Sequence, residues 1–78
     1  MIKRDFSRTF LRESYDMSEV LSFLADVENT ITGQQKDPDR IVTAQQAEDI
    51  KFSVRLRGFN VDEVDEEIDR LISVLRNL

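Results

Sequence analysis

The side chains best suited to chemistry in this sequence are carboxylates, because it contains no His and no Cys. Asp62 and Glu63 are followed closely by Asp65, Glu66 and Glu67. Acid–base catalysis needs two such groups in one cleft, in environments that separate their pKa values. A run of acids on an amphipathic helix is more simply a solvated face. Since the sequence also lacks a Ser–His pair, a Cys–His pair and a Gly-rich phosphate loop, we expect no enzyme activity.

The sequence gives no support to a metal or cofactor site. A typical zinc site needs Cys or His ligands. Asp37 and Asp39 alternate as ligands do in calcium loops. No suitably placed Glu closes an EF-hand loop around them, however. We therefore expect neither a metal ion nor a cofactor.

Size and charge narrow the class of protein further. With 78 residues, the chain is one small domain at most. The net charge of −5 argues against general nucleic-acid binding. No apolar run approaches the roughly 18 residues that a membrane span requires, and no apolar run follows the basic N-terminus to make a signal peptide. We expect a cytoplasmic protein.

The distribution of charged residues along the chain is more informative than the net charge. Bases outnumber acids by four to one in residues 1–12, and residues 51–58 hold three bases and no acid. Apolar residues stand among these bases: Phe6, Phe10, Leu11, Val54 and Leu56. Mixed basic and apolar segments can bind an anionic membrane surface. In the alternative interpretation, the apolar side chains fold back and pack on a short helix.

An internal repeat with a spacing of 44 residues puts the two basic segments in equivalent positions. Residues 15–31 align with residues 59–75 without a gap. In both copies apolar residues recur at alternating steps of three and four, which predicts a helix with a coiled-coil seam. The expected seam consists of Met17, Val20, Leu24, Val27, Ile31, Val61, Val64, Ile68, Leu71 and Leu75.

The residues that flank each repeat are good helix boundaries. Asp16 and Asn60 are favourable N-caps. Glu19 and Glu63 stand at the third helical position, as in a capping box. Gly33 is a natural end for the first long helix.

The connection between the two long helices contains a second capping signal. Residues 34–41 are polar, include a Pro and predict a linker. Thr43 and Gln46 then predict a capping box that opens a short helix over residues 44–51. Gly58 is expected to supply an unusual backbone angle at the turn before the last helix.

These features predict an all-α fold. Two long helices would form a short parallel coiled-coil-like pair within one chain, an intramolecular pseudo-dimer, with one short helix and two basic loops. Residues 1–33 would form a first, degenerate repeat, residues 34–41 the linker, and residues 42–78 the second repeat of one compact unit.

The second repeat resembles a known family. Residues 42–78 are similar to the N-terminal domain of the DivIVA family of bacterial division and polar-growth scaffolds. The resemblance is carried by the short capped helix, Phe52, the turn Arg57-Gly58-Phe59 and the helix start Glu63-Val64-Asp65. Residues 1–33 resemble a degenerate copy that lacks the Gly and the short helix and has a loop two residues longer. The chain thus looks like an actinobacterial tandem DivIVA-domain protein.

The resemblance implies membrane recruitment through loop tips, where an apolar residue followed by Arg contacts lipid. Leu56 and Arg57 match that pair, and Phe10 and Arg12 are the equivalents in the first copy. Two departures stand out. The family's long C-terminal coiled coil is missing, and Glu67 replaces an apolar residue such as Phe23 of the first copy.

The expected function is that of a non-enzymatic, peripheral membrane-directed adaptor in bacterial cell division or polar growth. It would act at the inner face of the cell membrane, and its partners would be the anionic membrane surface and division or cell-wall-growth proteins. A second copy of the chain, in a homo-oligomer, is a further candidate partner. The alternative is a soluble protein–protein adaptor or regulator that does not bind lipid.

Overall fold

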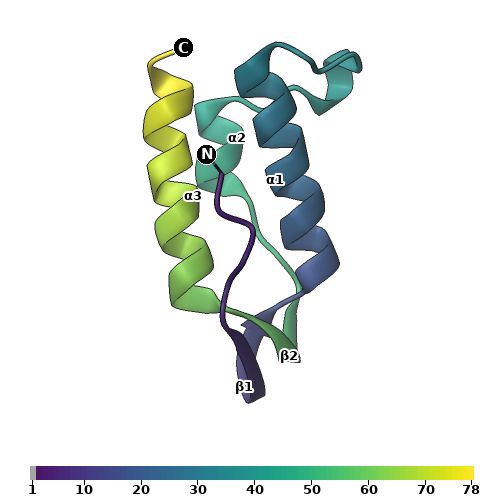
Figure 1. Ribbon diagram of the computed structural model, residues 1–78, viewed down its shortest axis with the longest axis vertical. Coiled ribbons are helices and arrows are strands. Elements are labelled where there is room, and N and C mark those ends of the chain that lie inside the picture. Colours follow the sequence, from purple (N-terminus) through teal and green to yellow (C-terminus); the bar gives the residue numbers. More distant parts are fainter. Residues whose placement is uncertain (1) are drawn as a thin grey trace.

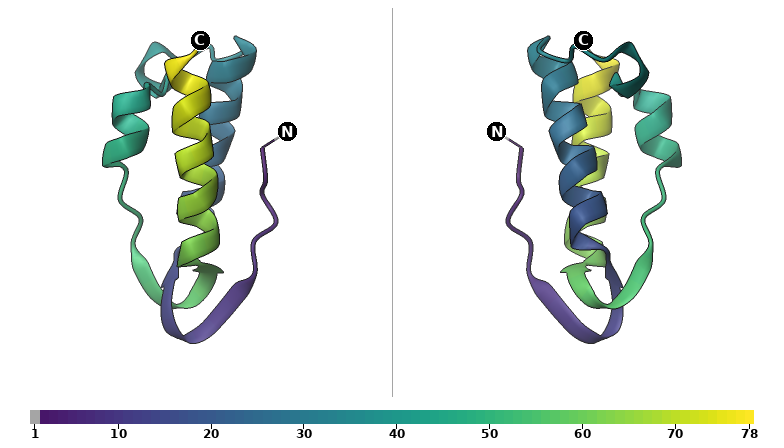
Figure 2. Two further views of the ribbon diagram at one scale, coloured as in Figure 1. Left: turned by 90° about the vertical axis from the view of Figure 1, so that its left-hand side faces the viewer. Right: turned by 90° about the vertical axis from the view of Figure 1, so that its right-hand side faces the viewer.

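The computed structural model describes residues 2–78 (Figure 1). In chain order, the elements are β1 (Arg8–Tyr15), α1 (Met17–Thr32), the short 3-10 helix η1 (Pro38–Arg40), α2 (Ala44–Asp49), β2 (Val54–Asn60) and α3 (Val61–Arg76). The helices α1 and α3 lie side by side and run in the same direction, both beginning at the end where β1 and β2 meet (Figures 1 and 2). That end is called the tip below.

The core lies between the two long helices. Of the ten expected seam residues, seven are buried: Val20, Leu24, Val27, Val64, Ile68, Leu71 and Leu75. Met17, Ile31 and Val61 are partly buried. Other elements complete the core with Phe6, Val42, Ala47 and Phe59. The hydrophobic interior is therefore shared among four parts of the chain and is not confined to one helix–helix seam.

The expected all-α fold is wrong, because the two basic segments form a two-stranded sheet. Arg8 pairs with Phe59, Thr9 with Gly58, and Phe10 with Arg57. The partner's number falls as β1 advances, so the paired backbones run in opposite directions. The pairing satisfies backbone N–H and C=O groups of both segments. It joins residues far apart in the sequence, which a local pattern does not reveal.

The expected coiled coil is also wrong. Each long helix has 16 residues, which corresponds to about 24 Å of helix. Within the described residues, α3 packs on α2 as well as on α1. On the opposite side, the segment before β1 runs along the same pair of helices (Figure 2). The pair is thus the centre of a small mixed α/β domain, because neighbouring segments cover apolar positions on both of its sides.

The predicted N-caps are confirmed. The Asp16 carboxylate accepts a hydrogen bond from the Glu19 backbone N–H, and the Asn60 side chain accepts one from Glu63. The capping box of α2 is complete between Thr43 and Gln46. Gly33 ends α1 with a φ of +74°, the left-handed conformation that favours Gly.

The expected capping boxes of the long helices differ in one respect: their glutamates bind the opposite repeat. Glu63 accepts a hydrogen bond of 2.9 Å from the backbone N–H of Ser7. In the same way, Glu19 accepts one of 2.9 Å from the backbone N–H of Ser53. The segment before each strand is therefore fixed to the helix start of the other repeat.

The serine carbonyls complete this exchange. The backbone N–H of Asn60 donates to Ser7, and that of Asp16 donates to Ser53. The aromatic rings also contact the opposite repeat. Phe6 packs on Phe59 with ring centroids 5.2 Å apart, and the equivalent Phe52 packs on Tyr15 at 5.3 Å. The two repeats are thus interlocked about an approximate internal twofold axis.

Gly58 has a role different from the one expected. The described glycine with positive φ is Gly33, so Gly58 needs no unusual backbone angle. A Cβ atom at Gly58 would lie 3.0 Å from the carbonyl carbon of Tyr15 and closer still to its oxygen. Gly is required there because the two interlocked strands approach each other closely.

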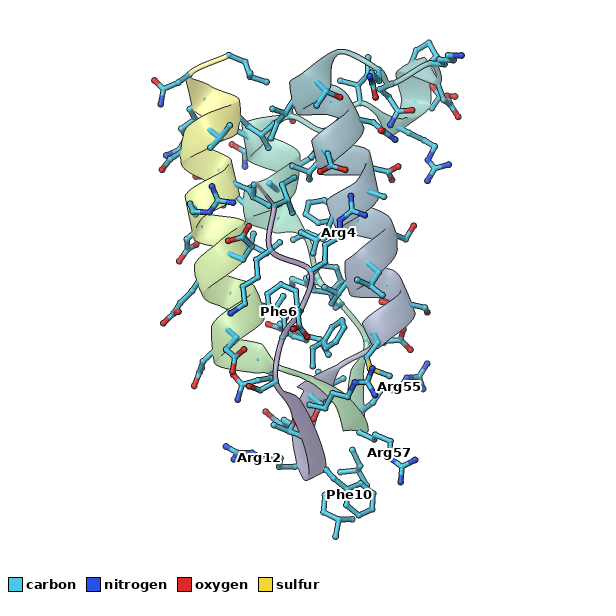
Figure 3. The ribbon with its side chains drawn as sticks, in the orientation of Figure 1. Arg4, Phe6, Phe10, Arg12, Arg55 and Arg57 are labelled. Atoms are coloured by element: carbon cyan, nitrogen blue, oxygen red, sulfur yellow. The ribbon has the colours of Figure 1, made fainter. Side chains whose placement is uncertain are left out.

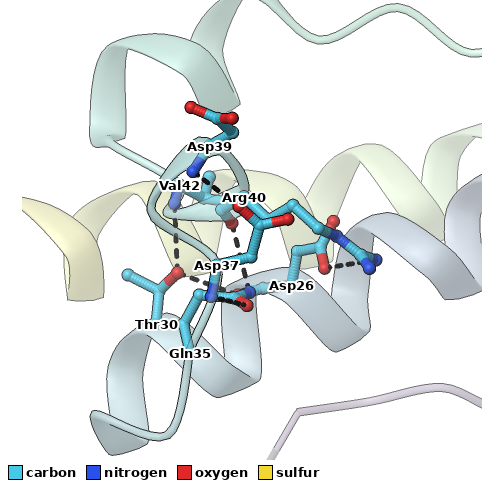
Figure 4. Close-up of polar contacts among 7 residues, drawn as sticks. All are labelled: Asp26, Thr30, Gln35, Asp37, Asp39, Arg40 and Val42. Carbon is cyan, nitrogen blue, oxygen red and sulfur yellow. Dashed lines mark hydrogen bonds and ion pairs between the residues drawn. The ribbon is translucent and has the colours of Figure 1, made fainter.

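The connection between the repeats is held against α1 (Figure 4). Arg40 forms an ion pair of 2.8 Å with Asp26. The backbone N–H of Val42 donates to the Thr30 hydroxyl at 3.0 Å. The Asp37 carboxylate accepts from the backbone N–H of Asp39 and caps η1. These contacts place α2 beside α3.

Candidate functional site

The tip gathers exposed apolar side chains from both strands (Figure 3). The exposed fractions are 59% for Phe10 and 71% for Leu11 in β1. In β2 they are 57% for Val54 and 65% for Leu56. The same two strands also carry four arginines. Arg8, Arg12, Arg55 and Arg57 are all exposed. The four predicted contact residues, Phe10, Arg12, Leu56 and Arg57, therefore lie at one end of the molecule.

Two of the tip arginines are oriented by neighbours. The guanidinium of Arg57 lies 4.8 Å from the centre of the Phe10 ring, within the range of a cation–π contact. Arg55 is 3.2 Å from the Asp16 carboxylate. Asp16 is itself the N-cap of α1. Arg55 therefore links the tip to the start of α1, while Arg57 lies at the surface beside the exposed ring of Phe10.

Leu11 also lies at the tip, although it is not among the four contact residues predicted from the sequence. Its φ is +60°, a left-handed conformation that costs a non-Gly residue about 1–2 kcal/mol. An exposed leucine gains no packing energy to offset that cost. Strained residues of this kind cluster at functional positions. The sequence does carry a signal for Leu11, because the loop of the first repeat is longer. No pairing with β2 occurs between Phe10 and Ser14, and Leu11 lies in this unpaired part of β1.

The apolar residues closer to the helices are not part of this surface. Phe6 is buried against Phe59. Phe52 is partly buried and packs on both Tyr15 and Phe23. Both rings pack against aromatic residues of the opposite repeat, whereas the alternative interpretation expected them to pack on the short helix. The surface at the tip therefore consists of Phe10, Leu11, Val54 and Leu56.

The departure at Glu67 also has a structural explanation. Glu67 is buried, and its carboxylate binds Arg70 and accepts a hydrogen bond from the backbone N–H of Lys3. In the first repeat, Phe23 occupies the equivalent position and packs on Phe52. A carboxylate suits position 67 because the N-terminal segment places the backbone N–H of Lys3 beside it. At the equivalent Phe23, the segment before β2 places the ring of Phe52 instead.

The carboxylates that hold the N-terminal segment have lowered pKa values. The backbone N–H of Ser7 is the main cause for Glu63, with a further contribution from Lys3. For Glu67, the hydrogen bond with Arg70 outweighs the opposing effect of burial. In contrast, burial and the hydrogen bond to Asp65 raise the pKa of Tyr15 to about 12. The N-terminal segment is thus attached to α3 by groups that act as ionised acceptors.

We expect stability to fall in acid through these carboxylates. A folded-state pKa below the unfolded value gives stability that is present above the unfolded pKa and is lost as pH falls through the folded one. The ordinary Glu value is 4.5. The urea midpoint should therefore change little between about pH 7 and 5 and decrease below about pH 4.5. Glu63→Gln should flatten this decrease. Glu66→Gln, at an exposed neighbour, is the matched control, and equal acid profiles for the two variants would contradict the assignment.

The carboxylates of the described residues do not gather into a metal centre. No group of three or more carboxylate side chains could hold a metal ion among residues 2–78. Asp37 and Asp39 are engaged in the turn that precedes α2. Nor is any helix in this range long and apolar enough to cross a bilayer. The exposed apolar and basic side chains of the tip make it the candidate site.

Comparisons with known proteins do not assign the chain to a family. No family model matches it, and neither the curated proteins nor the solved structures give a match. The DivIVA resemblance therefore receives no support from outside the residues that carry it and stays a prediction.

Proposed function

We propose that this chain is a non-enzymatic adaptor that docks on an anionic membrane surface through its tip. The observation that carries the proposal is the group of apolar side chains at the tip, which are more than half exposed, together with four exposed arginines of the same two strands. A compact domain gains nothing in its own stability from such a surface. Apolar insertion and electrostatic attraction to anionic head groups together explain both residue types.

The charge distribution along the molecule favours docking end-on. The acids of α3 that face solvent are Asp62, Asp65, Glu66 and Asp69. An anionic surface repels them, so the helical sides are disfavoured. Both strands contribute to the same end, and two weak contacts held together by one rigid fold reinforce each other through effective concentration. Each Arg near an anionic leaflet contributes about 1 kcal/mol, less at high salt.

Vesicle co-sedimentation tests the proposal. The wild-type chain should pellet with phosphatidylglycerol-containing vesicles at low salt, pellet less as salt rises, and stay in solution with phosphatidylcholine alone. The double variant Phe10→Glu/Leu56→Glu should bind at least about tenfold more weakly, because each change replaces an inserting side chain by a repelled charge. The circular dichroism spectrum should be unchanged, since both side chains are exposed.

Two further variants sharpen the test. Leu78→Glu adds one charge at a 70%-exposed leucine near the opposite end and should leave binding unaltered. Leu11→Gly removes an apolar side chain and relieves the left-handed strain, so it should weaken binding without lowering the melting temperature. If the wild-type chain stays in the supernatant at low salt, the tip is instead the contact surface of a soluble protein–protein adaptor.

The cellular role is proposed on the resemblance of residues 42–78 alone. We place the protein in the cytoplasm at the inner face of the cell membrane, acting with division or cell-wall-growth proteins. A fluorescent fusion in the native cell tests this, because a membrane-directed adaptor of division or polar growth concentrates at septa or poles. Uniform cytoplasmic fluorescence would rule that role out.

A further inference from the structure

The arginines of this chain divide into two groups by their partners. Each arginine outside β1 and β2 forms an ion pair with a carboxylate: Arg4 with Glu28, Arg40 with Asp26, Arg70 with Glu67 and Arg76 with Glu48. In the two strands, Arg55 pairs with Asp16. Within residues 2–78, Arg8, Arg12 and Arg57 have no carboxylate partner. Acidic residues outnumber basic ones by 16 to 11, so a shortage of acids does not explain these unpaired arginines.

Two of the unpaired arginines lie at the extreme end of the tip. Figure 3 shows Phe10 at this end, with Arg12 and Arg57 directed to opposite sides of it and a little closer to the helices. Arg8 begins β1 and pairs with Phe59, next to the start of α3. When the apolar side chains enter the boundary between head groups and acyl chains, the guanidinium groups of Arg12 and Arg57 come to the depth of the head groups.

The Phe10 ring holds the Arg57 guanidinium without using its hydrogen-bond donors. The guanidinium lies over the ring at 4.8 Å from its centre. The N–H groups of a guanidinium lie in its plane and point outward from its edge. A contact through the face therefore leaves these donors available to a ligand.

The surroundings of Arg12 favour a ligand that the membrane brings to it over a free anion. Arg12 lines a hollow of about 290 Å³ together with Glu13, Asn60, Val61 and Asp62. The Asn60 side chain is occupied as the cap of α3. Among the described residues neither acid pairs with Arg12, but both repel a dissolved anion. Insertion of the neighbouring apolar residues offsets that repulsion only for an anion that belongs to a lipid.

The bases of the two strands are all of one type. Each of them is Arg, whereas the lysines lie elsewhere: Lys3, Lys36 and Lys51. As charges, Arg and Lys are attracted alike by an anionic surface. They differ in that a guanidinium presents a planar fork of N–H donors, which binds two oxygens of one phosphate at once. Charge alone would be served by either residue, and a bidentate contact with phosphate requires Arg.

We infer that Arg12 and Arg57 bind the phosphate groups of membrane phospholipids through bidentate hydrogen bonds, with the apolar residues of the tip inserted beside them. This inference rests on the proposed membrane docking and adds its ligand, a lipid phosphate recognised by its oxygens as well as by its charge. A surface of equal charge but with weaker hydrogen-bond acceptors is then a poorer partner.

Vesicles that differ only in their anion test the inference on the wild-type chain. The neutral host is digalactosyldiacylglycerol, which carries no phosphate, and the anionic lipid is either phosphatidylglycerol or sulfoquinovosyl diacylglycerol at equal zeta potential. A sulfonate has the charge of a phosphodiester but accepts hydrogen bonds more weakly. The chain should bind the phosphatidylglycerol vesicles at least about fivefold more tightly. Equal binding would overturn this inference and leave membrane docking intact, whereas no binding to either vesicle would overturn both.

Inorganic phosphate separates a lipid phosphate from the free ion. Added at millimolar concentration and constant ionic strength, it should not release the chain from phosphatidylglycerol vesicles, because it has no acyl chain to bring it to the tip. Release would assign the site to the free ion and overturn the inference.

Charge-preserving variants then test the two arginines. Arg12→Lys/Arg57→Lys keeps both charges and removes both forks, so binding to phosphatidylglycerol vesicles should weaken at least about fivefold while binding to the sulfonate vesicles stays the same. The control Arg40→Lys/Arg76→Lys makes the same change away from the tip and should not alter the ratio. Both tip side chains are exposed, so the circular dichroism spectrum should not change. A ratio like that of the wild type in the tip variant would overturn the assignment.

Discussion

Replacing Gly58 by Ala should lower the free energy of unfolding by about 3 kcal/mol or more, at the upper end of what overpacking costs. The new methyl group would meet the backbone of Tyr15 at 3.0 Å or less, and its third neighbour is the Ser14 Cβ at 3.3 Å. Backbone cannot move aside as a flexible side chain can. Because β1 and β2 interlock at this point, the clash should loosen the tip as a whole. Urea denaturation followed by circular dichroism measures the change.

Gly33→Ala is the matched control for Gly58→Ala. Gly33 has a φ of +74° and open space around the position of a Cβ atom. Its replacement should therefore cost about 1 kcal/mol of backbone strain and create no clash. If Gly58→Ala were no more destabilising than Gly33→Ala, the close approach of the strands could not be the reason for Gly58.

Truncating Leu71 to Ala should cost about 2–5 kcal/mol, the range for a fully buried leucine. Leu71 is 1% exposed and faces the core between α1 and α3. A domain of this size has a small core and a stability near the lower end of the usual 5–15 kcal/mol. One such loss therefore removes a large part of it, and the thermal midpoint should fall sharply.

Leu78→Ala separates burial from residue type. Leu78 is 70% exposed, so the same truncation there should change the free energy of unfolding by less than about 0.5 kcal/mol. An unchanged melting temperature for Leu71→Ala would mean that the helical pair is not the centre of the core.

The conformation of the tip depends on the strands that carry it. At the tip, an unfavourable backbone conformation at Leu11 and exposed side chains are maintained by the rigid interlocked strands below them.

Local patterns in the sequence predicted the helices closely. The apolar periodicity and the caps at Asp16, Asn60 and Thr43 placed α1, α2 and α3 within a few residues of their observed bounds. The repeat alignment was informative for the same reason, since it compared equivalent short-range signals. Capping and periodicity act within one or two helical turns, so one local stretch of chain carries each of them.

The sheet was missed because its pairing is long-range. Val54 and Leu56 alternate with Arg55 and Arg57, which is a strand signal over four residues only. β1 shows no such alternation around Phe10 and Leu11. Without a visible partner strand, both segments resemble loops, which is why the sequence predicts an all-α fold.

The order of residues along the chain is enough to show where the helices begin and end, which of their faces are apolar, and that two basic, partly apolar segments precede them. The tertiary structure alone decided that these segments interlock, that Glu19 and Glu63 bind the opposite repeats, and that Leu11 projects from the tip. The physical reason is the range of the forces. Helix capping is satisfied within a few residues, whereas strand pairing and the close backbone approach at Gly58 require segments about 40 or more residues apart to meet.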